Sequence, residues 1–205
     1  MRRAARLLAL AAALALTPGV AEAHLVDTRL GDFYSGALHP LTDLQQVLPW
    51  IALAVLAAFQ GAARARWVVL AFPLALLAGA MAEMVLQLPT EAPILGLVLV
   101  AAMGLAVAAA ARLPLPALIA LAVVAGLLHG AQNAATMGPA TDRLLFISGM
   151  IASGYAVVTL GIGAAIAFLR GGTWRPIALR AGGSWVAAVG IMVLGLQMMT
   201  RAAAG

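Results

Sequence analysis

The chain has 205 residues, of which 64% are hydrophobic and 9% are charged. A typical soluble domain is about 25% charged and about half apolar, so this composition excludes a soluble enzyme, a nucleic-acid-binding module and a disordered chain. The formal net charge of +5 comes from twelve arginines that stand singly or in pairs between long apolar runs. These arginines form no basic stripe, so they indicate orientation in a lipid bilayer rather than a nucleic-acid partner.

Residues 1–23 have the features of a secretory signal peptide. Three arginines precede an apolar core at 7–16, and the small-x-small sequence at 21–23 is typical of a cleavage site just before His24. The alternative is an uncleaved first transmembrane helix, but ten apolar residues fall short of the roughly twenty that span a bilayer. We therefore expect a mature chain, 24–205, that starts outside the cytoplasm.

The mature chain is predicted to be one all-α transmembrane domain, a bundle of six helices. Apolar segments long enough to cross about 30 Å of hydrocarbon follow one another with short breaks. The predicted spans are 44–62, 67–87, 94–111, 116–134, 144–169 and 178–199. Alternating strand patterns are absent, and helices satisfy every backbone polar group within lipid.

The charges predict an orientation with both ends outside the cytoplasm. The leader places the mature N-terminus outside, and an even number of helices returns the C-terminus to the same side. Arginines then favour the inner loops by six to three, as the positive-inside rule requires. The six inner arginines are Arg64, Arg66, Arg112, Arg170, Arg175 and Arg180. Every acidic residue of the mature chain falls outside or in the outer half of a span.

Small and helix-bending residues indicate how the helices pack. Gly126 and Gly130 form a GxxxG pair, whose spacing lets two helix backbones approach closely. Pro49 and Pro73 lie inside predicted spans and are expected to kink them.

A first polar cluster precedes the first predicted span. Thr42 and Gln45 have the spacing of a capping box, so we expect the first membrane helix to start with Thr42 as its cap. Asp43 in the first turn complements the helix dipole, and His39 precedes it by four residues. Two interpretations stand: structural capping, and half of a cation site formed by His39 and Asp43.

A second polar cluster lies in the fourth predicted span. His129, Gln132 and Asn133 are three and four residues apart, which places them on one helical face. Polar side chains at membrane depth face a cavity or a partner helix, so both a functional site and hydrogen bonding between helices stay open. Glu83, the acid well inside a predicted span, is a candidate partner for His129 or Arg143; the alternative is that it lies at the outer interface.

All three histidines, His24, His39 and His129, map to the outer side or the outer half of the bilayer. If cleavage follows Ala23, the free amine and the imidazole of His24 form a chelating pair suited to copper, nickel or zinc. The sequence has no P-loop, no Gly-rich dinucleotide motif, no HExxH and no nucleophile elbow. We therefore expect no enzymatic activity and no tightly bound cofactor, only a transient Ni, Co or Cu ion.

Five short motifs are spread along nearly the whole chain. They are the leader followed by Ala23-His24, GALHPL at 36–41, FPLALLAGA at 72–80, LPTE at 88–91 and LHG at 128–130. With these motifs and the six-span layout, the chain resembles the HupE/UreJ family of hydrogenase and urease accessory membrane proteins. The resemblance implies a nickel or cobalt permease of the bacterial inner membrane that serves nickel enzymes through the motifs HPxxGxDH and HGHAHG.

The chain departs from the first of these motifs. His39-Pro40 is kept, but Asp43 stands at the Gly position and Gln45-Gln46 replaces the Asp-His pair. One imidazole and one carboxylate of the family pattern are thus exchanged for amides, which bind borderline divalent metals more weakly.

The second motif is altered in the same direction. His129-Gly130 is kept, while Ala131 and Asn133 occupy the other two His positions. Two hypotheses follow. One is a metal permease or metal-handling accessory of a metalloenzyme, with an outward-facing entry site formed by His39, Asp43, His129, Gln132 and Asn133. The other is a membrane scaffold or maturation accessory without bound metal, which the lost ligands favour.

Overall fold

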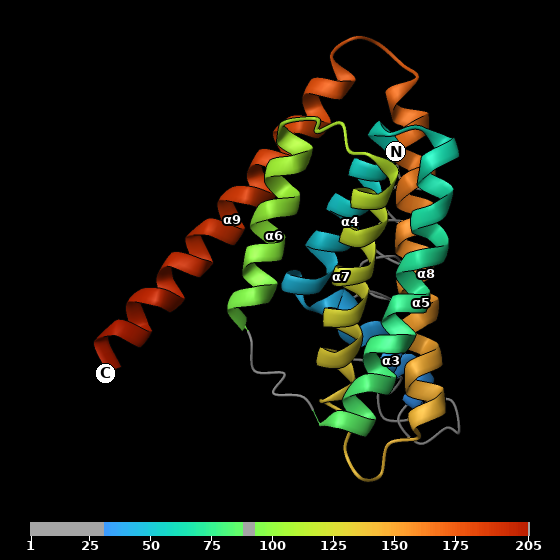
Figure 1. Ribbon diagram of the computed structural model, residues 1–205, viewed down its shortest axis with the longest axis vertical. Coiled ribbons are helices and arrows are strands. Elements are labelled where there is room, and N and C mark those ends of the chain that lie inside the picture. Colours follow the sequence, from blue (N-terminus) through green and yellow to red (C-terminus); the bar gives the residue numbers. More distant parts are fainter. Residues whose placement is uncertain (1–30, 88–92, 205) are drawn as a thin grey trace, which may run out of the picture. The chain divides into compact units, whose positions relative to one another are not determined.

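A computed structural model describes residues 31–87 and 93–204 of the chain, and in this part the regular structure is helical throughout (Figure 1). The helices are α3 (Gly31–Thr42), α4 (Leu44–Phe59), α5 (Ala62–Leu86), α6 (Pro93–Ala108), α7 (Leu115–Ala134), α8 (Arg143–Leu169) and α9 (Arg175–Ala204). The predicted all-α fold class is confirmed. The predicted signal peptide, 1–23, and His24 lie outside the described residues.

Helices α4 to α9 coincide with the six predicted apolar segments. Within the described residues, four of them are long and apolar enough to cross a membrane individually, and the bent pair α3–α4 makes a fifth candidate if it is one span. Helix α6 has 16 residues, which rise about 24 Å and fall short of the roughly 30 Å of a bilayer core. A multi-pass membrane protein is supported, and the six spans with both ends outside stay a prediction.

The start of α4 differs from the sequence prediction. A separate helix, α3, precedes it, and the two helices meet at Asp43 with a bend of 78°. Asp43, rather than Thr42, is the N-cap of α4: its backbone is extended (φ −95°, ψ 111°), and its Oδ1 accepts the backbone N–H of Gln45 at 2.8 Å. Thr42 instead closes α3 by donating to the carbonyl of His39 at 2.9 Å. The expected Thr42 cap was wrong because an Asp one residue later competes for the same free N–H groups.

The GxxxG pair of α7 packs against α5 as predicted. A Cβ added at Gly126 would lie 2.6 Å from the Cβ of Ala75, and one added at Gly130 would collide with the carbonyl of Leu76. Gly79 of α5 meets the backbone of Leu127 in the same way. Helix backbones therefore touch along this pair, where a side chain has no room.

Two further pairs use the same device. Helix α3 packs on α8 through Gly36 and Gly149, each of which faces the backbone of the other helix. Helix α6 packs on α9, where Gly183 faces Val107 and the backbone of Ala108. Figure 1 shows α6 and α9 running side by side along one flank of the bundle.

The connections α4–α5, α6–α7 and α8–α9 lie at the same end of the bundle (Figure 1). Gln60, at the end of α4, joins two of them, because its side chain donates to the carbonyl of Ala111 at 2.8 Å and accepts the N–H of Leu113 at 3.2 Å. Of the described arginines, this end carries Arg64, Arg66, Arg112, Arg170, Arg175 and Arg180. The opposite end carries Arg143 and Arg201.

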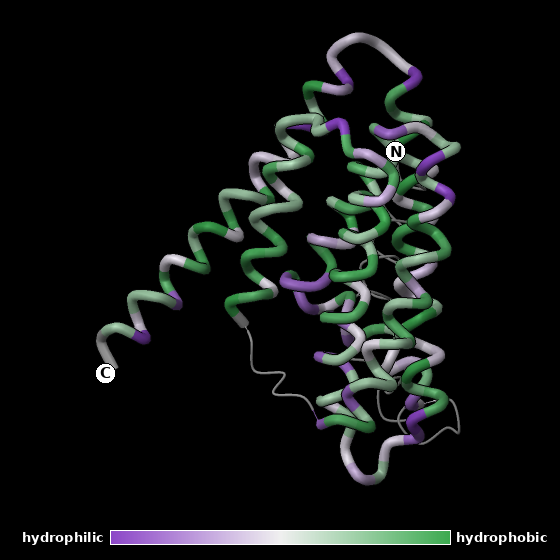
Figure 2. Tube along the Cα trace, in the orientation of Figure 1, coloured by the Kyte–Doolittle hydropathy of each residue, from purple (hydrophilic) through white to green (hydrophobic). Residues whose placement is uncertain are grey.

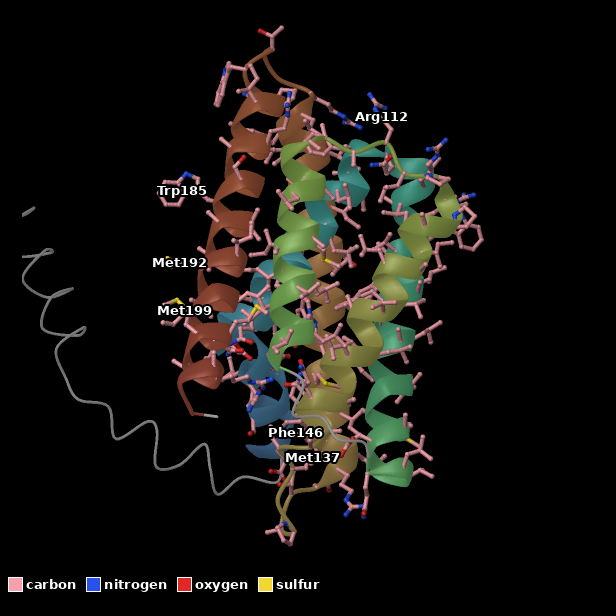
Figure 3. All side chains as sticks on the ribbon, turned by 60° about the vertical axis from the view of Figure 1, so that its left-hand side comes forward. Arg112, Met137, Phe146, Trp185, Met192 and Met199 are labelled. Atoms are coloured by element: carbon pink, nitrogen blue, oxygen red, sulfur yellow. The ribbon has the colours of Figure 1, made fainter. Side chains whose placement is uncertain are left out.

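The outer surface of the helices is apolar, while the polar side chains described below are buried. On α9, Trp185, Met192 and Met199 are 76%, 68% and 72% exposed, and Figure 3 shows them projecting away from the bundle. This inverts the pattern of a water-soluble helix, whose exposed face is polar. The surface is that of a protein surrounded by lipid.

Candidate functional site

A connected set of buried polar side chains joins α4 to α7. In the described part of the chain, the buried polar side chains are Gln46, His129, Asn133 and Ser153. The first three belong to one series of hydrogen-bonded side chains, which we call the polar chain. Ser153 instead bonds back to its own helix, at the carbonyl of Met150. Buried polar groups in a lipid-facing bundle either stabilise helix packing through interhelical hydrogen bonds or form a functional site.

The polar chain starts at the break between α3 and α4. Asp43 Oδ2 accepts a hydrogen bond from Gln46 Nε2 at 3.2 Å. Gln46 Oε1 in turn accepts from Asn133 Nδ2, which also donates to the backbone carbonyl of His129 at 2.7 Å. One carboxylate and two amides thus connect the two helices.

Trp50 completes the chain at His129. The indole N–H donates to His129 Nδ1 at 2.7 Å, and both side chains are fully buried. The edge of Phe72 packs on the indole with ring centroids 5.4 Å apart. The sequence prediction missed Trp50 and Gln46. Their spacing of four residues, which puts both on one face of α4, was the available signal, because a buried indole N–H needs an acceptor.

Two buried atoms of the polar chain have no hydrogen-bond partner within 31–87 and 93–204. Neither His129 Nε2 nor Asn133 Oδ1 has a hydrogen-bond partner among the residues that the structure describes. The two side chains are one helical turn apart on α7 and are both 0% exposed. One nitrogen and one oxygen of the polar chain are therefore not used in hydrogen bonds within the described residues.

Gln132 points to a different neighbour. A Cβ added at Gly96 of α6 would lie 3.8 Å from Gln132 Nε2 and 3.9 Å from Gln45 Oε1. Gln45 and Gln132 therefore both lie against α6 at Gly96, beside the chain and outside its hydrogen bonds.

A cavity of about 380 Å³ opens at the break. Its polar wall is formed by Thr42, Asp43 and Gln45, and its apolar wall by α6 and α9. It gives a small ligand room beside the Asp43 carboxylate.

Some predicted site residues lie apart from this chain. His39 stacks edge-on against Phe146 of α8, with ring centroids 6.3 Å apart, and its bond to Asp43 is not observed. Glu83 Oε2 has no partner within the described residues, and His129 Nδ1, for which Glu83 was one candidate partner, is bonded to Trp50 instead. No group of three or more His, Cys, Asp or Glu side chains in 31–87 and 93–204 has the arrangement of a metal site.

The comparisons with known proteins bear on this site. The family model described as HupE / UreJ protein matches residues 12–193. The chain belongs to the HupE/UreJ family. The protein HupE of Rhizobium leguminosarum bv. viciae is 29% identical over 185 residues, which cover 89% of this chain and 94% of that protein. No solved structure matches the chain.

The departures from the HupE/UreJ motifs now have a spatial meaning. Gln46 and Asn133 stand at two positions where the family pattern has His, and in the structure their side chains bond to each other. His129, which keeps the family's imidazole, lies one turn from Asn133 and is bonded to Trp50. The two residues that replace the family's histidines are therefore hydrogen-bonded to each other.

Proposed function

We propose that this member of the HupE/UreJ family is a metal-handling accessory membrane protein that passes a divalent transition-metal ion, nickel or cobalt, towards a metalloenzyme. The ion enters at the break between α3 and α4 and meets the polar chain of Asp43, Gln46, Asn133 and His129. The mature N-terminus lies in the periplasm and the arginine-rich end of the bundle faces the cytoplasm of the inner membrane.

The break between α3 and α4 carries this proposal. Helix α4 has 16 residues and rises about 24 Å, whereas α8, with 27 residues, rises about 40 Å from the same end. The break thus lies part-way along the bundle, and Figure 2 shows a polar stretch there, flanked by apolar helices. Transporters place discontinuous helices and their ion sites at such depth, and non-helical backbone is tolerated where it lines a cavity.

The electrostatics of the break favour a cation. The C-terminal carbonyls of α3 end there, and such helix ends carry partial negative charge. Asp43 adds a full negative charge and borders the cavity. The positive N-terminus of α4 is offset by the same carboxylate, which caps it.

The donor atoms suit transient binding. Asp43 and Gln45 border the cavity and offer a carboxylate oxygen and an amide oxygen, whereas the imidazole nitrogen of His129 lies in the buried interior, outside the cavity lining. Oxygen-rich sets with one nitrogen hold borderline divalent metals less tightly than clusters of imidazoles. Weak binding is compatible with passage of an ion and unfavourable for its storage.

A second function is favoured by one observation. The polar side chains of α4 and α7 are bonded to one another, as in a bundle held together by interhelical hydrogen bonds. In this alternative the protein is a non-transporting scaffold for metalloenzyme maturation. It predicts co-purification of a partner enzyme and no metal on the isolated protein.

The two functions are separated by metal accumulation in cells. A strain without its own nickel and cobalt uptake, expressing the protein, is expected to accumulate more metal than the empty strain. His129→Ala should abolish the gain, and His39→Ala should reduce it only if the His39 side of the break lies on the path. Unchanged accumulation with the wild-type protein, at equal membrane abundance, would contradict the permease.

A further inference from the structure

The bond between Trp50 and His129 fixes where the imidazole proton lies. An indole N–H donates and cannot accept, so His129 Nδ1, 2.7 Å away, must present a lone pair. In a neutral imidazole one nitrogen is the acceptor and the other carries the hydrogen. His129 is therefore held as the tautomer with its proton on Nε2.

This tautomer changes what the free atoms of the site offer. Nε2 becomes a hydrogen-bond donor, and Asn133 Oδ1, one turn along the same face, is an acceptor. Both are unpartnered within the described residues and completely buried. A donor beside an acceptor fits a neutral molecule that both accepts and donates, of which water is the smallest, and it repels a bare cation from Nε2.

We propose that Trp50 is the specificity-determining residue of this site: it holds His129 in a tautomer that cannot bind metal through Nε2, so that metal ligation requires the Trp50 bond to break. The statement about metal ligation rests on the proposed function, whereas the statement about the tautomer does not. The structure then corresponds to the closed state, in which the bond from Trp50 to His129 Nδ1 is intact.

The packing around Trp50 keeps the indole in place. Phe72 contacts it edge-on, and Gly154 of α8 leaves the space into which both rings fit, since a Cβ there would lie 3.2 Å from Phe72 and 3.6 Å from Trp50. An indole confined on two sides presents its N–H in one direction.

The tautomer is measured directly by ¹⁵N NMR of the full-length protein in nanodiscs. The chain has three histidines, so a variant with His24→Ala and His39→Ala reports His129 alone. Two-bond ¹H–¹⁵N correlations identify the protonated ring nitrogen. We expect the proton on Nε2, with Nδ1 as acceptor; a proton on Nδ1 would overturn the proposal. This measurement is made with Trp50 unchanged.

A second measurement tests the consequence for metal. Trp50→Phe keeps an aromatic ring and removes the N–H, which frees either nitrogen of His129. Because a buried hydrogen bond contributes about 1 kcal/mol or somewhat more, Ni²⁺ titrated into the variant is expected to bind about tenfold tighter than to the wild type. The matched control is Trp185→Phe, at an indole 76% exposed on α9, which should leave affinity unchanged.

Three outcomes are informative. A gain in Trp50→Phe that disappears when His129→Ala is added supports the proposal. An equal affinity of the wild type and Trp50→Phe, with Ni²⁺ bound by both, overturns it. Proton on Nε2 with no Ni²⁺ bound by any variant supports the role of Trp50 in holding the tautomer and removes the proposed metal cargo instead.

Discussion

At the scale of single residues, Asp43 has two roles that substitution can separate. Its Oδ1 caps α4 through the N–H of Gln45, and its Oδ2 accepts from Gln46, the first member of the polar chain. Its charge also borders the cavity at the break. An Asn side chain retains the cap but removes the charge and the Oδ2 acceptor, whereas Ala removes all three.

We therefore predict different effects for Asp43→Asn and Asp43→Ala. Asp43→Ala should lose the cap, which contributes about 1 kcal/mol, together with the bond from Gln46 Nε2, while Asp43→Asn should keep the cap and lose only that bond, with the smaller loss of stability. Both should lose metal accumulation if the charge attracts the ion. Thermal unfolding in detergent and cellular nickel content provide the two readings; an active Asp43→Asn protein would argue against a role for the charge.

The pair of Gln46 and Asn133 leads to a prediction of gained function. Because these amides touch and stand where the family pattern has imidazoles, Gln46→His together with Asn133→His should add two imidazole nitrogen ligands, which suit nickel, close to His129. Nickel affinity should rise by at least about tenfold, measured by calorimetry on the purified protein. A control is Gln60→His, at the other end of α4, which should leave nickel affinity unchanged although it removes the bonds of Gln60 to Ala111 and Leu113; an equal rise in affinity with the two variants would contradict this placement of the site.

The sequence predicted part of this site and missed the rest for physical reasons. His129 and Asn133 were found because polar residues stand out in an apolar helix. Trp50 was missed because a tryptophan is ordinary in an apolar span, and only the three-dimensional structure brings its N–H to a histidine 79 residues away. Gln46 was noted only as a departure from a motif, since its partner lies on another helix.

At the scale of helices, close packing of α5 on α7 depends on glycines that leave no room for a side chain. At Gly130 a Cβ would collide with backbone of α5, which cannot move aside as a flexible side chain would. By contrast, a Cβ at Gly163 of α8 would have no neighbour within 4 Å. The two glycines thus form a matched pair for testing the packing.

Gly130→Ala is expected to destabilise the protein by about 1–3 kcal/mol, because α7 must shift away from α5. Gly163→Ala should be neutral or stabilising by at most about 1 kcal/mol, as alanine is the better helix former. Unfolding in a denaturing detergent series measures both. A Gly130→Ala protein as stable as Gly163→Ala would mean that α5 and α7 are not in backbone contact.

The helices themselves were largely predictable and their interruption was not. Apolar runs separated by Pro, Gly and Arg placed α4 to α9, because lipid requires long apolar helices. The break was overlooked because Asp43 suits the first turn of one helix as well as the junction of two. Residues 31–42 are too polar to stand out as a span, and packing of Gly36 on α8 makes their helix part of the bundle.

At the scale of the whole molecule, the arginine-rich end fixes the expected orientation. Six of the described arginines belong to the end that carries the α4–α5, α6–α7 and α8–α9 connections, and the positive-inside rule assigns that end to the cytoplasm.

The chain has no cysteine, so single cysteines report accessibility without background. We predict that an impermeant maleimide labels Pro139→Cys, between α7 and α8, on intact cells and spares Thr173→Cys, between α8 and α9, until the membrane is opened. The reverse pattern would invert the topology.

Passage of a divalent metal across the membrane by way of the polar break can be measured with purified protein in vesicles that enclose a nickel-sensitive dye. We expect nickel entry well above that of protein-free vesicles, equal entry with Gly163→Ala, and entry at the protein-free rate with His129→Ala. Wild-type protein that is folded and inserted yet admits nickel no faster than protein-free vesicles would show that the ion does not take this path.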